Sequence, residues 1–509
     1  MLVSAAFVDS NAFYINFTLL VFSLIAEPDK NNALIHFIDP GRMSQIRKRS
    51  LKATFWIYFG FLIGAVNTYF LTHKNWFSTD QNGLTRAMIE ISQLIFAFSS
   101  LGTTSFLFKF FPYYHDNLEN RKNDLLGTAL KISLIGFVIT AASLYFLQPL
   151  IIRKFSANSL LLVEYFFWII PMGFAVLLYS LLETYSYGFN KGVLTSLLKE
   201  TILRMYTLVI IVCKVMGWID FSVFIKLFSL QYGIIFLVLA IHLKRENQLW
   251  LQLSRSRLTF RYRKKILAIT SLTFIVIVVS VLRQSIDGLV LAAKQNLGKV
   301  GIFGLASYMV SVLQAPFRSL VAVTIPVLSR AWKDKNLPEI NRIYHRSSIN
   351  LLSFALLGFG CIWLNYTNGI LYFGINPDYL EGKWVFFLLG LVTLIETGTG
   401  VNAQIIGTST YWRFELWTSL LLTALLIPLS YTLTVRYGII GPAIANLISF
   451  SVYNAVRIYF LWNKYRMQPF SGKTVEVLFI ACIAFVVSAW VEQWLEGLMA
   501  MIVSVLLYA

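Results

Sequence analysis

Charged residues are scarce in this sequence, and its few cysteines and histidines form no ligand pattern. Only 13% of the 509 residues are charged, against roughly 25% in a soluble domain, so the soluble globular class is excluded. The cysteines (Cys213, Cys361 and Cys482) are widely spaced in apolar runs, and the histidines show no metal-ligand spacing. With no Walker loop and no catalytic constellation, we expect no enzyme activity, no metal and no cofactor.

Long apolar runs fill the chain instead. Hydrophobic residues make up 57% of the sequence, and a run of about 20 is enough to cross a bilayer as a helix. The runs predict an all-α polytopic membrane protein with about fourteen transmembrane helices. The expected spans are 53–72, 85–108, 127–148, 162–182, 197–214, 221–242, 266–292, 301–325, 348–373, 383–406, 414–435, 440–462, 473–491 and 495–509.

The excess of basic residues predicts orientation. A net charge of +19 would indicate nucleic-acid binding in a soluble protein, but here the basic residues lie mostly between apolar runs, so we expect no nucleic-acid partner. The heaviest clusters, Lys244–Lys265 and Arg330–Arg346, fall on the same side of the membrane. The positive-inside rule places this side, and the flank that begins at Met43, in the cytoplasm.

The first 42 residues do not fit the pattern. A short apolar run, Asn11–Ala26, lacks the basic start of a signal peptide. Met43 then opens a basic flank, Met43–Lys52, that leads into a regular span. We interpret residues 1–42 as an upstream extension or a misplaced start, with an extra membrane-associated segment as the alternative.

The spans repeat along the chain. The starts of the first six recur in the next six at offsets of about 215 to 221 residues, which predicts two parallel six-helix repeats plus two C-terminal helices. Phe111–Asp116 and Ile325–Arg330 end corresponding spans with a proline near each start. Two such bundles, rocking against each other, would give alternating access to a central cavity. The expected domains are a bundle at 43–245, a basic cytoplasmic linker at 246–265, a bundle at 266–466 and two extra helices at 467–509.

Glycine-rich helix entries carry a family resemblance. Tyr437–Ser449, running on to Asn463–Ser471, resembles the twelfth-helix region of polysaccharide-type flippases, as does Leu297–Tyr308 leading to Pro326–Trp332. The likeness extends from Met43 to the C-terminus. It is to the polysaccharide transporter, or O-antigen flippase, branch of the multidrug/oligosaccharidyl-lipid/polysaccharide exporter superfamily, which is similar to the lipid II flippase. Multidrug efflux transporters share that fold.

Arginines within the spans are the substrate-binding candidates, because intramembrane charges are retained mainly for function. The resemblance implies a cavity walled by spans one, two, seven and eight that takes a lipid pyrophosphate bearing a sugar chain. Arg86, Arg283 and Arg318 fall on three of these spans, and arginine binds phosphate through a rigid fork of donors. The alternative is self-neutralisation, since Arg86 and Glu90, like Arg283 and Asp287, are spaced i, i+4.

Other intramembrane charges have weaker assignments. Asp287 and Glu396 are candidates for ion coupling, and the polar stretch that holds Glu396 must face protein or water. Glu200 and Arg204 are expected to pair with each other, and Arg457 is expected to anchor the protein near an interface.

The sequence and the resemblance together predict a flippase that moves a polyprenyl-pyrophosphate-linked oligosaccharide (an O-antigen, capsule or exopolysaccharide unit) across a bacterial inner membrane. The expected partners are this lipid-linked oligosaccharide, membrane lipids and other polysaccharide-assembly membrane proteins. The resemblance also implies that the last two helices form a groove for the lipid tail.

Two rival functions stay open. Multidrug efflux by the same fold is the first alternative; organic cations would call for acidic cavity residues, whereas the expected cavity holds more arginine than carboxylate. A membrane glycan polymerase or ligase is the second, but such an enzyme needs a large outer loop, and every outer loop here is short.

Overall fold

The computed structural model describes residue 56, residues 59–492 and residues 497–508. Eight helices in this part of the chain are long and apolar enough to cross a membrane, and ten if each of two bent pairs counts as one span. The only β-type contact among these residues is an isolated bridge between His73 and Ile375. The prediction of an all-α polytopic membrane protein is confirmed, whereas the interpretation of residues 1–42 and of Met43 concerns residues outside the described ones.

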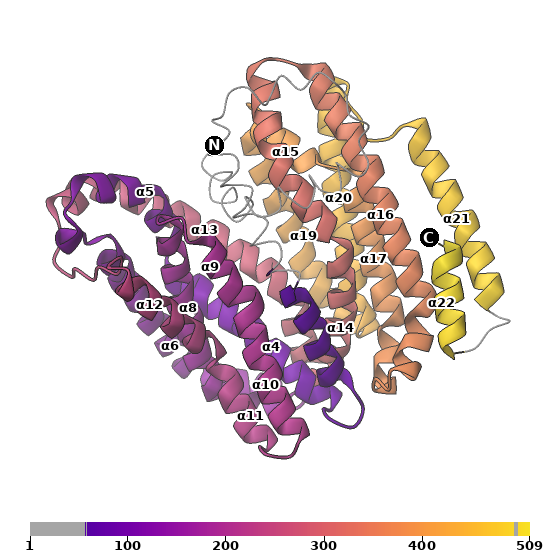
Figure 1. The fold of residues 1–509 in the computed structure, drawn as a ribbon, viewed down its shortest axis with the longest axis horizontal. Helices are drawn as coiled ribbons and strands as arrows, with labels where there is room; N and C mark the ends of the chain where they lie inside the picture. The colour runs from indigo at the N-terminus through magenta and orange to yellow at the C-terminus, as the bar shows by residue number, and fades with distance from the viewer. Residues whose placement is uncertain (1–55, 57–58, 493–496, 509) are drawn as a thin grey trace. The chain divides into compact units, whose positions relative to one another are not determined.

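The helices form two compact units (Figure 1). The N-terminal unit comprises Trp76–Gly301 and the described residues before Thr72; the C-terminal unit comprises Thr72–Asn75 and the described residues from Ile302 onwards. The N-terminal unit holds the apolar helix Phe59–Thr72 up to Leu71, α4 (Thr79–Ser100), α5 (Thr103–Asn117), η2 (Asn120–Lys122), α6 (Leu125–Phe155), α7 (Leu160–Glu164), α8 (Phe166–Tyr187), α9 (Gly192–Ser196), η3 (Leu197–Ile202), α10 (Leu203–Val215), α11 (Phe221–Ser229), α12 (Gln231–Arg245) and α13 (Arg257–Lys294).

The C-terminal unit holds the remaining helices. Helix α14 (Leu297–Leu313) begins in the N-terminal unit and ends in the C-terminal one. The elements that follow are α15 (Ala315–Lys333), α16 (Leu337–Tyr372), η4 (Pro377–Gly382), α17 (Lys383–Gly398), α18 (Asn402–Thr408), α19 (Trp412–Tyr437), α20 (Ile440–Tyr465), α21 (Gly472–Glu492) and α22 (Gly497–Tyr508).

The second span of each half is broken. Helices α4 and α5 meet at a bend of 53°, where Leu101 and Gly102 both have positive φ and so end α4. In the other half, α14 and α15 are interrupted at Gln314. The expectation of one unbroken helix over 85–108 was therefore wrong, because the apolar pattern runs through the bend without interruption.

Gly102 marks a close approach to α13. A Cβ at this position would overlap the carbonyl oxygen of Thr270, which lies on α13. Helix α13, the first helix of the predicted second bundle, thus packs on α4 and α5 in the N-terminal unit. Of the predicted linker, 246–265, only the part up to Ser256 is non-helical, because α13 begins at Arg257. The Ser256 hydroxyl caps α13 by accepting a hydrogen bond from the Thr259 N–H at 3.2 Å.

The last two helices pack on α16. Tyr508 of α22 donates a hydrogen bond to the Leu356 carbonyl at 3.0 Å, and its ring fills the space that a side chain at Gly360 would need. The outward side of α21 is exposed and apolar, including Phe479, Ile480 and Val486, as expected for a helix that faces lipid.

Candidate functional site

Arg86 and Glu90 form an ion pair on α4. Arg86 Nε lies 3.2 Å from Glu90 Oε1, one helical turn away. The Glu90 side chain is 13% exposed and that of Arg86 is 35% exposed, so the guanidinium reaches out of the packed interior while the carboxylate stays within it. The self-pairing alternative considered from the i, i+4 spacing is confirmed for these two residues.

Glu90 is accommodated by a glycine on α13. A Cβ added at Gly288 would overlap the Glu90 carboxylate, so the absence of a side chain at Gly288 lets the acid lie against α13. The neighbouring residue, Asp287, is close enough to act on Glu90 electrostatically. Arg283 lies one turn earlier on the same helix and is half-buried. The structure therefore brings Arg86, Glu90 and Asp287 to one contact between α4 and α13.

Charge at this contact is balanced. In the parts of α4 and α13 that hold this contact, the two arginines Arg86 and Arg283 are accompanied by the two carboxylates Glu90 and Asp287. Such a balance lowers the free energy needed to hold these charges in lipid. Arg318, the third arginine of the predicted cavity, lies on α15, so the predicted excess of arginine over carboxylate stays a prediction.

Arg318 and Glu396 lie in the C-terminal unit. Arg318 is exposed and lies one turn after the break between α14 and α15. Gln314, at the break, donates from Nε2 to Glu396 Oε2 and to Thr393 Oγ1, both at 3.3 Å. Glu396 is therefore tied to the break through Gln314. The substrate role of Arg318 and the coupling role of Glu396 stay predictions.

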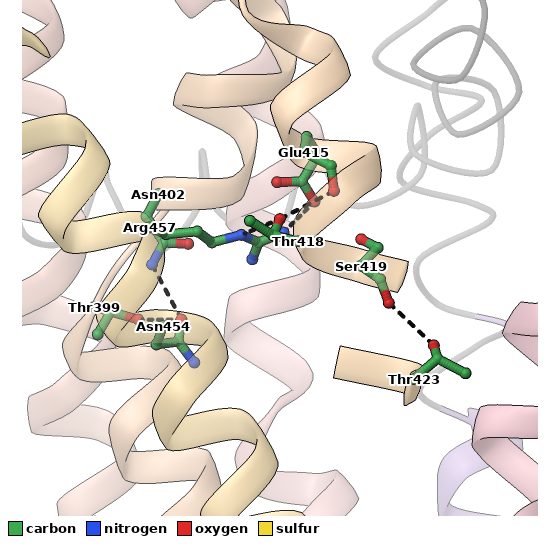
Figure 2. A network of polar contacts seen from close by, with 8 residues as sticks. All are labelled: Thr399, Asn402, Glu415, Thr418, Ser419, Thr423, Asn454 and Arg457. Carbon is green, nitrogen blue, oxygen red and sulfur yellow. Dashed lines mark hydrogen bonds and ion pairs between the residues drawn. The ribbon is translucent and has the colours of Figure 1, made fainter. Parts of the chain in front are cut away.

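The sequence analysis missed the most buried charge of the C-terminal unit. Arg457 of α20, expected as an interface anchor, has a side chain only 3% exposed. Its guanidinium pairs with Glu415 of α19, donates from Nε to Thr418 Oγ1 at 3.3 Å, and lies 3.6 Å from the centre of the Tyr453 ring. Figure 2 shows the arginine extending from α20 towards α19. The anchor prediction was wrong, because Arg457 points into the helix packing.

The same network reaches the break between α17 and α18. Asn454, one turn before Arg457, accepts hydrogen bonds from Thr399 Oγ1 and Asn402 Nδ2, each at 3.0 Å (Figure 2). Gly400 has φ +57°, and the two helix segments bend by 48°. The polar stretch around Glu396 does face protein, as predicted. The sequence does show that Asn454 and Arg457 lie one turn apart on the same helix. Their partners lie on other spans, and no local spacing in the sequence indicates those contacts.

A third charged group lies in the N-terminal unit at the π-helical turn η3. Glu200 pairs with Arg204 at 2.8 Å, which confirms the expected self-pair, and Lys199 lies 3.6 Å from Glu183 of α8. The Arg204 guanidinium also lies over the Phe61 ring at 4.9 Å. π-Turns insert one extra residue into a helix and are frequent where side chains must be re-aimed.

No group of three or more His, Cys, Asp or Glu side chains within the described residues is arranged to hold a metal ion. The N-terminal unit presents the guanidiniums of Arg86 and Arg283, each spaced one turn from a carboxylate on its own helix. The C-terminal unit separately presents that of Arg318, one turn after a helix break. Such groups can bind and release a phosphate, because arginine stays protonated and binds oxygens in pairs.

No family model and no curated protein matches this sequence. Solved structures do match its fold. The lipid II flippase MurJ, in an inward closed conformation, is similar with a TM-score of 0.68 at 15% identity, over 90% of this chain and 96% of that chain.

Multidrug transporters match as well. An inward-facing multidrug resistance MATE family transporter of the MOP superfamily has a TM-score of 0.60 at 15% identity, over 80% of this chain and 96% of that one. A MOP superfamily transporter from Pyrococcus furiosus has a TM-score of 0.53 at 14% identity, over 82% and 95%. This multi-pass membrane protein therefore has the fold shared by the MurJ flippase and the MATE transporters of the MOP superfamily.

Proposed function

We propose that this chain is a transporter that flips a polyprenyl-pyrophosphate-linked oligosaccharide from the cytoplasmic to the outer leaflet of a bacterial inner membrane. The observation that carries the proposal is the match of its fold to the lipid II flippase over 90% of the chain. The two parallel repeats expected from the sequence suit alternating access, in which one bundle rocks against the other.

Arginines within the spans supply the chemistry for a pyrophosphate. Arg86 contacts Glu90 through Nε, and the carboxylate holds the guanidinium in one orientation. Arg283 is half-buried on α13, and Arg318 is exposed on α15. A pyrophosphate that approaches such groups exchanges water for charge-assisted hydrogen bonds of about 1.5–3 kcal/mol each.

Paired charges also suit release. An arginine already balanced by a carboxylate does not bind phosphate irreversibly, since the anion must compete with Glu90 or Asp287 for it. The sugar would follow the pyrophosphate through the protein while the polyprenyl tail stays in lipid, beside the exposed apolar side of α21.

Multidrug efflux is the second candidate. The MATE transporter with a TM-score of 0.60 and the balanced charge on α4 and α13 favour it, since a cation would bind Glu90 and Asp287 rather than the arginines. Pyrophosphate transport requires the arginines, and cation efflux requires the carboxylates. Substitutions that remove only one sign of charge therefore distinguish the two functions.

Complementation tests the proposal directly. In a strain that lacks its own oligosaccharide flippase, we expect the wild-type chain to restore surface glycan. The double substitution Arg283→Ala/Arg318→Ala should lower the glycan by at least about tenfold, through loss of two phosphate ligands. The matched control Arg121→Ala/Lys122→Ala removes two charges from the loop between α5 and α6 and should complement fully.

Two results would contradict the proposal. Full complementation by Arg283→Ala/Arg318→Ala would remove these arginines from the site. Absence of complementation by the wild type for several glycans, together with verified membrane insertion and increased resistance to cationic drugs, would establish efflux instead.

A further inference from the structure

The segment Lys244–Lys265, here called the basic strip, is fixed on the N-terminal unit. Tyr185 donates a hydrogen bond to the Gln248 carbonyl at 3.1 Å, and Lys131 donates one to the Leu253 carbonyl. Asp124, which is fully buried, accepts from the Ser256 N–H at 2.9 Å. The connection between α12 and α13 is thus held along the unit by contacts to its backbone, while Leu249, Leu258 and Tyr262 pack on the core and the charged side chains stay exposed.

The outward side chains are almost all positive. The strip contains eight lysines and arginines and one acid, Glu246, and all nine of these side chains are exposed. Glu246 accepts a hydrogen bond from Lys191, which lowers the pKa of its carboxyl, and it also lies 3.0 Å from His242. No described carboxylate pairs with any of the eight cations: Lys244, Arg245, Arg255, Arg257, Arg261, Arg263, Lys264 and Lys265.

Apolar side chains alternate with these cations. Phe260 is 63% exposed and Leu253 is 58% exposed, and Arg263 lies over the Phe260 ring at 4.4 Å. Single exposed apolar residues are common on protein surfaces, but here they lie within a dense set of cations. Mixed cationic and apolar side chains are typical of segments that lie at the membrane interface.

The length of α13 places the strip at that interface. The helix has 38 residues, or about 57 Å, against about 30 Å for the hydrocarbon core. Its residues 266–282 carry no charged side chain, which is about 26 Å of helix. The strip ends at Lys265, directly where this apolar part begins, and so lies at the depth of the lipid phosphates.

We propose that the basic strip is a docking surface for the headgroups of anionic phospholipids in the leaflet at the N-terminal end of α13, the predicted cytoplasmic leaflet. Unpaired cations at headgroup depth attract anionic lipid, and the exposed Phe260 and Leu253 insert among the lipids. The chemistry is that of a bilayer surface, since the cations are spread from the last turn of α12, through the connection, to the first turns of α13.

A second basic segment provides the matched control. Arg330–Arg346 of the C-terminal unit is also basic, but Arg330 lies 3.7 Å from Asp334 and Arg342 lies 2.9 Å from Glu339. Its positive charge is therefore partly neutralised within the segment, and we expect it to bind anionic lipid less.

Lipid binding to the purified full chain tests this proposal without any glycan substrate. Native mass spectrometry would compare bound phosphatidylglycerol with bound phosphatidylcholine for three proteins: the wild type, R261Q/R263Q/K264Q/K265Q, and the control R330Q/K333Q/K335Q/R342Q, which removes the same number of charges. We expect the strip variant to lose its preference for phosphatidylglycerol by more than about tenfold and the control to keep it.

Several outcomes would overturn the proposal. Retained preference in the strip variant would show that the strip does not bind the lipid. An equal loss in both variants would leave net charge as the cause. Displacement of phosphatidylglycerol by soluble pyrophosphate at equimolar concentration would identify a free-phosphate site instead of a lipid surface. If the strip variant does not fold, the salt dependence of phosphatidylglycerol binding to the wild type provides the test. Binding that does not weaken with added salt would contradict docking by charge.

Discussion

Two intramembrane ion pairs of this chain have the same chemistry and differ in what they join. Arg86 and Glu90 lie one turn apart on α4, whereas Arg457 of α20 and Glu415 of α19 lie on different helices. The first pair is formed within one helix. The second fixes two helices to each other, and its network extends to the break between α17 and α18.

Exposure separates the pairs further. Arg86 is about ten times more exposed than Arg457, at 35% against 3% of the side chain. A guanidinium that reaches outward can exchange its partner for a ligand, but one enclosed by Tyr453, Thr418 and Glu415 cannot. This difference in exposure is consistent with the ligand role proposed for Arg86, and the enclosed contacts of Arg457 indicate a structural role.

The largest expected effect is on stability, from Arg457→Ala. Removing this cation breaks the buried ion pair with Glu415, which should lower the free energy of unfolding by about 3–5 kcal/mol. Denaturant unfolding of the purified protein measures the change. Arg86→Ala also takes the ion pair from a carboxylate, Glu90, but the guanidinium that it removes is 35% exposed, so we expect a smaller loss of about 1 kcal/mol. Equal losses would contradict the distinction between the two pairs. Recovery of stability in Arg457→Leu/Glu415→Leu would show that the buried charges cause the loss.

The second effect concerns the interrupted spans α4–α5 and α14–α15. Gly102→Ala adds a Cβ at a positive φ and against the Thr270 carbonyl of α13, so we expect a loss of about 2–4 kcal/mol in unfolding free energy. Gln314→Ala, at the corresponding break, removes one side chain's hydrogen bonds and should cost about 1 kcal/mol. A harmless Gly102→Ala would show that the bend is not packed against α13.

The smallest effect is on function alone. Arg86→Ala should lower glycan transport by about tenfold, equivalent to about 1.4 kcal/mol, while stability stays nearly unchanged. Glu90→Gln keeps the size of the side chain and the positive charge of Arg86, so transport should fall less than in Arg86→Ala. Complementation level, normalised to protein in the membrane, measures both. A greater loss in Glu90→Gln would favour efflux of cations.

The spans were predictable from sequence because the bilayer imposes a simple length and polarity rule. Helix α19 begins at Trp412 and α20 at Ile440, close to the predicted starts at 414 and 440. The pairing of Arg86 with Glu90, and of Glu200 with Arg204, was also accessible, since i, i+4 neighbours are determined by helix geometry.

Contacts between helices were not predictable. Arg457 was misplaced because its partner Glu415 is 42 residues away and no periodicity relates them. The bend at Leu101–Gly102 was not predicted, because an apolar run indicates where a span lies but not where the backbone takes a positive φ. Helix α13 packs in the N-terminal unit through close approaches at Gly102 and Gly288. Two glycines in a long sequence do not indicate which helices they bring together.

The length of α13 has a mechanical consequence. The helix contains no proline, so nothing in its sequence interrupts a rod of about 57 Å. A tilt of about 5° around its midpoint would move its two ends by about 2.5 Å in opposite directions. One end carries the basic strip and the other half carries Arg283 and Asp287. A tilt of α13 would therefore move its part of the basic strip and the region of Arg283 and Asp287 together, because both lie on one helix.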